Sequence, residues 1–407
     1  MNVNETSSST AGRPRFDFED QLDQWRELRA NNPLSHDEQS GMWRLFDYDS
    51  VATVLSDPAV FSSDFSGLTP VQEDFETFRR GNFVGMDPPA HRKLRTLVSQ
   101  AFTPRTVAGL QPRIEAITGE LLDGVADVDQ FDLVDTLAYP LPIIVIAELL
   151  GIPTVDRDMF IRWAAVLFGG DQLEDASDMA AIQRALDAIA PTIREMNDYI
   201  LDHIRHHRAN PDTGLTSRLI AAEVDGERLE DQEIVGFVAL LLVAGHITTT
   251  ALLGNAVVVL DRHPAAAEAL RADPDGLPTA IEEVLRYLPP FAQLGRRTTR
   301  EVTFGDTTVP ADSILMVNLA SANRDERYFT EPDAFDVGRK PNAHLTFGHG
   351  IHFCFGAPLA RLEGRIALRQ LFDRYQDIAI EPDRPVQFQN PQVIVSVRHL
   401  PIGVRRA

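Results

Sequence analysis

The chain of 407 residues contains one cysteine, Cys354, so no disulfide can form within it. Cys354 lies in the run 347–361, flanked by Gly348, Gly350 and Gly356. Glycines let the backbone approach a flat, bulky group and direct N–H groups at it. Apolar residues recur at helical spacing just beyond the cysteine, and the positive end of the predicted helix favours a thiolate. The loop is therefore suited to an anionic sulfur.

Three kinds of chemistry fit this sulfur. A free cysteine can simply pack in the interior, although the surrounding glycines count against that interpretation. A zinc site could use Cys354 with His344, His349 and His352, but zinc motifs usually pair two short ligand clusters and no second cluster follows. The third possibility is an axial thiolate ligand to haem iron, which favours cleavage of the O–O bond.

Further landmarks give the chain a resemblance to the cytochrome P450 family. The run 347–361 is similar, residue for residue, to the haem-binding signature of that family, with Cys354 at the position of the thiolate ligand. Residues 283–286 resemble its Glu-x-x-Arg element, 87–95 its haem-contacting helix, and 335–339 the stretch before the cysteine loop. The resemblance extends from about residue 15 to the C-terminus. It implies a mainly α haem domain with minor β-sheets and haem b as cofactor.

The resemblance also implies roles for charged side chains. Haem carries two propionates, which need basic or hydrogen-bonding partners. The expected partners are His91, Arg95, Arg296 and His352, and Arg297 is adjacent to the third of them. Glu283 and Arg286 are expected to form a structural pair near the cysteine loop. Their spacing alone describes an ordinary surface i,i+3 pair of little energetic weight.

The apolar segment 234–260 is long enough to cross a membrane. It contains polar residues at 245–246, 248–250 and 255, which favour a helix buried in protein over one facing lipid. The resemblance places residues 244–249 of this helix over the distal face of the haem, with oxygen bound beside Ala244 and Gly245.

Thr248 would help to deliver protons to bound dioxygen, and the preceding position in the family is usually acidic. Here it is Ile247, which can neither donate nor conduct a proton. One interpretation is that ordered water, His246 or substrate hydroxyls take over. The other is an altered outcome, such as peroxide leakage or chemistry that needs less proton delivery.

The substrate pocket is expected, by analogy of position, to be mostly apolar with one amide to fix orientation, which suits a sizeable apolar molecule. Its predicted lining comprises Phe83, Val84, Phe168, Ala244, Phe291, Gln293 and Leu294. The chain resembles soluble bacterial members that act on polyketides and macrolides, which implies hydroxylation or epoxidation. Oxidative coupling, cyclisation or rearrangement without net oxygen insertion stays open as an alternative. A haem sensor without catalysis is a weaker hypothesis, because Thr248 and an apolar pocket would serve no purpose in it.

Electrons must come from a separate protein, because neither a flavin nor an iron–sulfur segment is visible. The resemblance implies a ferredoxin and an NAD(P)H-dependent ferredoxin reductase. Arg361, Arg365 and Arg369 recur every four residues after the cysteine. This basic stripe is either a solvated helix face or a docking site for an acidic ferredoxin.

Composition and patterning complete the expectations. The formal charge of −22 argues against nucleic acid as a partner. Residues 1–15 are predicted to be a disordered lead-in without a secretory signal, so we expect a cytoplasmic protein without a membrane partner and a monomer. No linker interrupts 16–407, which is predicted to form a single domain. Periodicity predicts helices over 107–125, 141–150, 159–168, 180–206, 234–260, 278–287 and 359–375. It predicts strands over 42–46, 314–319 and 393–397, and a strand pair over 302–309 that turns at 305–306.

Overall fold

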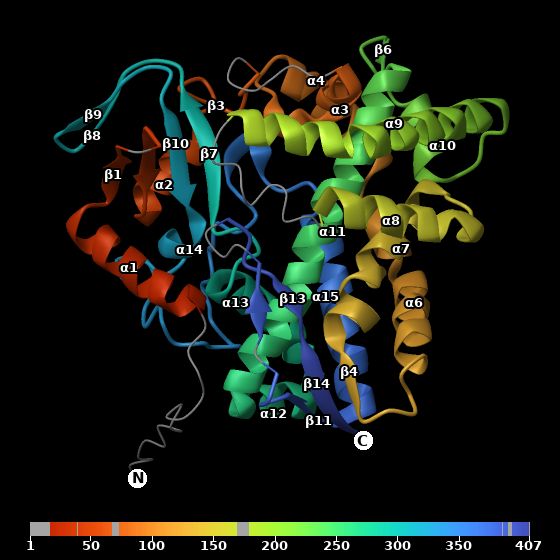
Figure 1. Ribbon diagram of the computed structural model, residues 1–407, viewed down its shortest axis with the longest axis vertical. Coiled ribbons are helices and arrows are strands. Elements are labelled where there is room, and N and C mark those ends of the chain that lie inside the picture. Colours follow the sequence, from red (N-terminus) through yellow and green to blue (C-terminus); the bar gives the residue numbers. More distant parts are fainter. Residues whose placement is uncertain are drawn as a thin grey trace.

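The computed structural model describes residues 17–38, 40–66, 73–168, 179–384, 386–389 and 393–406. The predicted lead-in, 1–15, lies outside these residues. The described chain is mainly helical, as expected (Figure 1). The helices are α1 (Asp17–Asn31), α2 (Tyr48–Ser56), α3 (Glu73–Gly81), α4 (Ala90–Ala101), α5 (Pro104–Gly109), α6 (Gln111–Asp123), α7 (Pro140–Leu150), α8 (Arg157–Phe168), α9 (Met179–Ala209), α10 (Leu215–Ala221), α11 (Asp231–Arg262), α12 (Pro264–Ala272), α13 (Leu277–Tyr287), α14 (Leu319–Ala322) and α15 (Ala357–Arg374).

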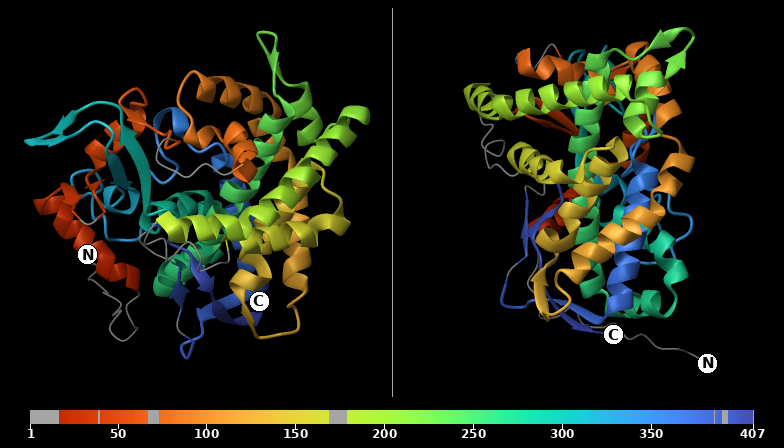
Figure 2. Two further views of the ribbon diagram at one scale, coloured as in Figure 1. Left: turned by 45° about the horizontal axis from the view of Figure 1, so that its top comes forward. Right: turned by 90° about the vertical axis from the view of Figure 1, so that its right-hand side faces the viewer.

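Helix α11 runs through the middle of the molecule, beside α15 (Figures 1 and 2). A capping box between Glu230 and Glu233 satisfies its first backbone N–H groups, and Pro264 follows its C-terminal cap. The helix is long and apolar enough to cross a membrane, yet 67% of its most apolar window is buried inside the protein. It packs against α3, α7, α9 and α15, so it is the central core helix of this fold.

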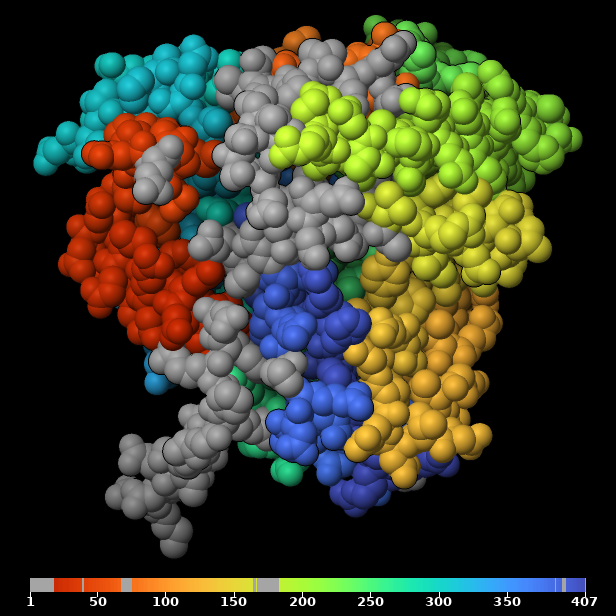
Figure 3. Space-filling view, in the orientation of Figure 1, coloured from red at the N-terminus to blue at the C-terminus, as the bar shows by residue number. Residues whose placement is uncertain are grey.

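The strands form small sheets around the helices. A five-stranded sheet has the order β1-β2-β10-β7-β3, and a three-stranded sheet has the order β11-β14-β4. The five-stranded sheet lies with α1 and α2 on one side of the molecule, while α8, α9 and α10 occupy the opposite side (Figures 1 and 3). The strands are β1 (Leu34–Asp37), β2 (Met42–Leu45), β3 (Phe61–Ser62), β4 (Gln130–Asp132), β5 (Glu223–Val224), β6 (Glu227–Arg228), β7 (Gln293–Thr298), β8 (Val302–Phe304), β9 (Thr307–Val309), β10 (Ile314–Asn318), β11 (Tyr375–Ile380), β12 (Gln387–Phe388), β13 (Val397–His399) and β14 (Pro401–Arg406).

Most predicted elements are confirmed, and two need correction. The predicted helix 107–125 is two helices, α5 and α6, separated at Leu110, because Pro112 lacks the N–H that would continue α5 and instead starts a new helix. The predicted strand 393–397 is wrong: only an isolated bridge joins Ile394 to Phe291, and β13 begins at Val397. The hairpin 302–309 is confirmed as β8 and β9.

Candidate active site

A cavity of about 230 Å³ lies between α11, the start of α15, strand β7 and a short helical turn, η1 (Phe83–Gly85). Five of the predicted pocket residues line it: Phe83, Val84, Ala244, Phe291 and Leu294. The polar side chains of its wall gather around Cys354 and at Thr248 and Thr249. The rest of the wall is apolar, which excludes water from most of the space.

The other two predicted pocket residues, Gln293 and Phe168, are not among those that line the cavity. Side chains alternate along β7, and Leu294 and Arg296 face the cavity, so Gln293 belongs to the other face of the strand. The predicted orienting role of Gln293 is therefore wrong. Phe168 is the last residue of α8, and its side chain lies outside the described part of the chain.

The cysteine loop is held by its own backbone. The Cys354 N–H donates to the Phe347 carbonyl at 2.7 Å, and Gly348 and Gly350 adopt φ values of +72° and +68°. A β-carbon on Gly350 would lie 2.7 Å from the Leu55 carbonyl oxygen of α2. The turn therefore requires glycine at both positions, and the close approach of α2 requires it a second time at Gly350. A β-carbon at Gly356, by contrast, would meet no described atom within 4 Å.

The electrostatics at Cys354 favour an anion more than its burial alone would. Burial raises the pKa of the thiol, but the backbone N–H groups of Gly356 and Ala357, followed by Arg95 and Arg361, act in the opposite direction. These N–H groups belong to the start of α15, whose positive end faces the sulfur. The loop therefore supplies hydrogen-bond donors that stabilise the thiolate formed when the thiol releases its proton on binding a metal.

A basic cluster lies beside the sulfur. The rings of His91 and His352 are 4.4 Å apart, and Nε2 of His91 and both ring nitrogens of His352 are buried without a partner among the described residues. Burial lowers the pKa of His352 to about 3, assisted by His91, Arg296 and Arg95. Four basic side chains thus cluster here, and the unpartnered ring nitrogens of His91 and His352 make the cluster suited to carboxylates.

The two adjacent arginines of β7 are separated by strand alternation. Arg296 is buried and faces the cavity, where burial lowers its pKa. Arg297 lies on the opposite face and pairs with Asp312 at 3.0 Å. The structure therefore places Arg296, as expected, with the basic cluster.

Helix α11 presents one face to the cavity. Thr248 lies on it, and its hydroxyl donates to the Ala244 carbonyl at 2.8 Å. His246 points away: it is 1% exposed, and its ring packs edge-on against Tyr139 at 4.3 Å. Burial lowers the pKa of His246 to about 4. Neither His246 nor Ile247 belongs to the described lining, so His246 is a wrong candidate for proton delivery to this cavity.

Glu283 and Arg286 form a fully buried pair instead of the surface pair that their spacing describes. Both side chains are 0% exposed, and Nη2 of Arg286 donates to Oε1 of Glu283 at 2.8 Å. Glu283 also accepts from Arg339 and from the Asp336 N–H, while Arg286 donates to the Asn323 carbonyl and other carbonyls of the same loop. The pair thereby ties α13 to the loop that leads into the cysteine.

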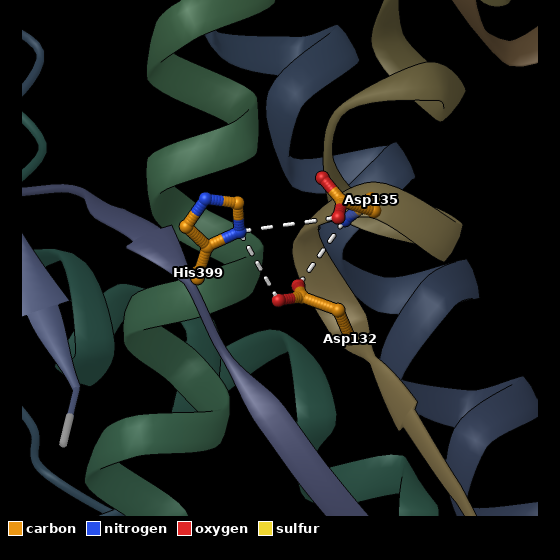
Figure 4. Close-up of side chains that lie close together, drawn as sticks. All are labelled: Asp132, Asp135 and His399. Carbon is orange, nitrogen blue, oxygen red and sulfur yellow. Dashed lines mark hydrogen bonds and ion pairs between the residues drawn. The ribbon is translucent and has the colours of Figure 1, made fainter. Parts of the chain in front are cut away.

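The structure does not support a zinc site at Cys354. His344 pairs with Glu282 at 3.3 Å, whereas the His352 ring packs at a tilt against the His91 ring, so the expected donors are not gathered around Cys354. Among the described residues, only Asp132, Asp135 and His399 bring three potential metal ligands together (Figure 4).

The cluster in Figure 4 involves β4 and β13, and none of its three residues lines the cavity. Oδ1 of Asp132 already accepts the backbone N–H groups of Val134 and Leu400. His399 Nδ1 is 3.3 Å from Oδ2 of Asp132, and both His399 and Asp135 are exposed. These contacts explain the cluster as a local connection between strands.

The predicted basic stripe is largely engaged with neighbouring side chains. Arg361 forms two hydrogen bonds with Glu282 and lies over the Phe347 ring at 4.5 Å. Arg365 donates to Gln111, and Arg369 pairs with Asp373 one turn further along the helix.

Several lining residues were missed by the sequence analysis, among them Phe102, Ile146, Phe237, Leu240 and Leu252. Helical spacing could have found those on α11, since positions 237, 240 and 241 share a face with Ala244 and Thr248. Phe102 and Ile146 carry no such signal, because distant segments bring them to the wall.

Fold and cavity together define a protein that encloses an apolar space with a single, partly buried thiol in its wall. The sequence profile described as "Cytochrome P450" matches residues 35–404. The chain belongs to the cytochrome P450 family and is a cytochrome P450 monooxygenase.

Its relatives act in secondary metabolism. The chain is 45% identical over 385 residues to the cyclomarin C epoxidase CymV of Salinispora arenicola, covering 94% of this chain and 96% of that protein. It is 42% identical over 387 residues to the erythromycin C-12 hydroxylase of Saccharopolyspora erythraea, covering 94% of each. The solved structure of HmtT, involved in himastatin biosynthesis, superposes with a TM-score of 0.85 at 45% identity, covering 93% of this chain and 96% of that chain.

The family implies a haem-thiolate cofactor, and the residues present fit it. Most of the cavity wall is apolar and Cys354 lies in it, while His91 and His352 beside the sulfur leave buried ring nitrogens without a partner among the described residues, as carboxylates would need.

Proposed function

We propose that Cys354 is the axial ligand of haem b and that the enzyme inserts one oxygen atom from O2 into a sizeable apolar secondary metabolite, by hydroxylation or epoxidation. The observation that carries this proposal is a single, partly buried thiol in the wall of an apolar cavity, beside four basic side chains. Two of these, His91 and His352, keep buried ring nitrogens without a partner among the described residues. The relatives that epoxidise cyclomarin C and hydroxylate erythromycin support a macrolide-type or similarly large substrate.

The protein's own residues would bind and shield the reactants. His91, Arg95, Arg296 and His352 would hold the propionates, and the sulfur of Cys354 would bind the iron. Bound haem supplies the activation of dioxygen and the transfer of one oxygen atom. Apolar side chains around the cavity orient the substrate and exclude water, which limits unproductive proton leakage.

Proton supply is the unusual step. The Thr248 hydroxyl proton is engaged with the Ala244 carbonyl, so the oxygen of this hydroxyl is free to accept from a second group. Ile247 provides no acid, and His246 faces away from the cavity. Ordered water or a substrate hydroxyl would therefore bring the proton to Thr248 or to Thr249, which also lines the cavity.

We also propose a separate ferredoxin and an NAD(P)H-dependent ferredoxin reductase as electron donors, in the cytoplasm. Because Arg361 is engaged with Glu282 and Arg369 with Asp373, an acidic ferredoxin would contact Arg365 in preference.

Two measurements test the proposal. Reduced, carbon-monoxide-bound protein should show the red-shifted main absorption band of thiolate ligation, and Cys354→Ser should lose it; a persistent band in the serine variant would refute Cys354 as ligand. Turnover under labelled dioxygen should place one labelled oxygen in the product.

The second candidate function is coupling, cyclisation or rearrangement without oxygen insertion, and Ile247 favours it. An unlabelled product formed with consumption of reductant would support that candidate. Ile247→Glu should raise the amount of product formed per reductant consumed if the missing acid limits how efficiently the enzyme uses its electrons.

A further inference from the structure

Helix α3 crosses the N-terminal half of α11 at two glycines. A β-carbon on Gly236 would lie 2.6 Å from the backbone nitrogen of Gly81 and 2.8 Å from its Cα. A β-carbon on Gly81 would overlap the backbone of Gly236 and Phe237. The two helices are therefore in direct backbone contact, and each helix needs glycine at the crossing.

This contact differs from the other tight glycines of α11. A β-carbon on Gly245 would meet the end of the Ile146 side chain at 2.8 Å, and one on Gly254 would meet a Val397 methyl at 2.6 Å. Side chains of that kind can rotate aside. Backbone atoms of a neighbouring helix cannot, so any side chain at Gly81 or Gly236 must move α3 as a unit.

The crossing adjoins the cavity on both sides. Phe83 and Val84 lie two and three residues after Gly81 in the chain, and both line the cavity. Phe237 follows Gly236 and lines the cavity from α11. The Phe83 and Phe237 rings stack with centroids 6.1 Å apart and planes at 27°. The separation of α3 and α11 therefore sets how these two aromatic walls meet.

We propose that Gly81 and Gly236 are positioning residues that hold the Phe83–Val84 wall against α11 and thereby select the size of molecule the cavity retains. The inference rests on the proposed function in one respect, that this cavity is the substrate site. With the two helices held this close, the cavity should bind bulky ligands that reach from the haem to Phe83 in preference to small ones.

The test compares a bulky and a small ligand in the haem-loaded protein. Clotrimazole fills a large cavity, whereas imidazole occupies only the position next to the iron, and both are followed by the haem absorption spectrum. Gly236→Ala and Gly81→Ala should each raise the Kd of clotrimazole about tenfold or more and change that of imidazole by less than about twofold.

Matched variants sharpen the result. Gly119→Ala is the control, because Gly119 lies within α6 and its β-carbon would make only an ordinary contact at 3.6 Å with Arg374; both affinities should stay at wild-type values. The double variant Gly81→Ala/Gly236→Ala should weaken clotrimazole less than the sum of the single effects, because either β-carbon separates the same two helices.

Unchanged clotrimazole affinity in both single variants would overturn the inference, and so would equal losses for clotrimazole and imidazole. If the variants do not retain haem, amide exchange of the wild type decides: clotrimazole should slow exchange over residues 73–86 more than imidazole does, and equal protection would contradict the proposal. Wild-type protein without haem absorption would overturn the proposed function and this inference with it.

Discussion

Glu363 is a buried carboxyl that the proposed chemistry does not use. It lies in α15, is 1% exposed, and its Oε2 has no hydrogen-bond partner among the described residues. Burial raises its pKa from the ordinary 4.5 to about 8. At neutral pH the folded protein therefore holds Glu363 as a neutral acid, because an isolated carboxylate would be costly there.

This shift makes stability depend on pH. Between pH 4.5 and about pH 8 the folded state keeps a proton that the unfolded state has lost, so the free energy of unfolding falls as the pH rises through this window. Above about pH 8 the loss is complete. A shift from 4.5 to about 8 corresponds to about 5 kcal/mol at about 1.4 kcal/mol per pKa unit.

Glu363→Gln removes the titration at nearly constant shape. Relative to wild type, the variant should gain stability progressively from pH 5 to pH 9, by up to about 5 kcal/mol across the range. Urea unfolding of the haem-loaded proteins at several pH values measures the difference. The change with pH is the informative quantity, since a buried amide adds a constant cost of about 1–3 kcal/mol.

Glu195→Gln, an exposed position on α9, is the control and should follow the wild-type profile at every pH. Parallel profiles for wild type and Glu363→Gln would refute the reasoning, because the carboxyl would then titrate alike in the folded and unfolded states.

Three further outcomes are expected. Arg286→Ala should lower the free energy of unfolding by about 3–5 kcal/mol, because it leaves Glu283 buried and unpaired. Arg26→Ala, at an exposed pair, is the control and should lower it by less than about 1 kcal/mol. Similar losses in the two variants would show that burial of the pair does not matter. His352→Leu should accelerate transfer of haem to a scavenging apoprotein, because one propionate partner is lost, and an unchanged rate would argue against that role. Arg365→Glu should slow reduction by an acidic ferredoxin and weaken its salt dependence; if both are unaffected, docking does not involve this position.

The central helix and the cysteine loop were predictable because local signals determine them. Apolar continuity and a capping box define α11, and the signature around Cys354 is contiguous in sequence. The expected pairing of Glu283 with Arg286 is also local, but its burial depends on a loop about fifty residues away, which contributes Arg339. Spacing alone cannot reveal that loop.

Other features could not be predicted, because they depend on the direction in which a helix presents a side chain or on contacts with segments far away in the sequence. His246 was a plausible proton donor by its position in the chain, but the helical turn directs it toward Tyr139. The alternation at 393–397 resembled a strand, yet the available partner there is a single bridge to Phe291. The contact between Gly81 and Gly236 could not be read from sequence, because it arises from two segments that meet only in the folded chain.

Contacts between protein groups hold the cysteine loop in place. The Leu345 N–H donates to the Asn323 side chain, the Thr346 hydroxyl donates to the Leu285 carbonyl, and Gly350 abuts α2. None of these contacts involves the cofactor, so the apoprotein should present a preformed cradle, and re-adding haem should restore the enzyme without refolding of this region.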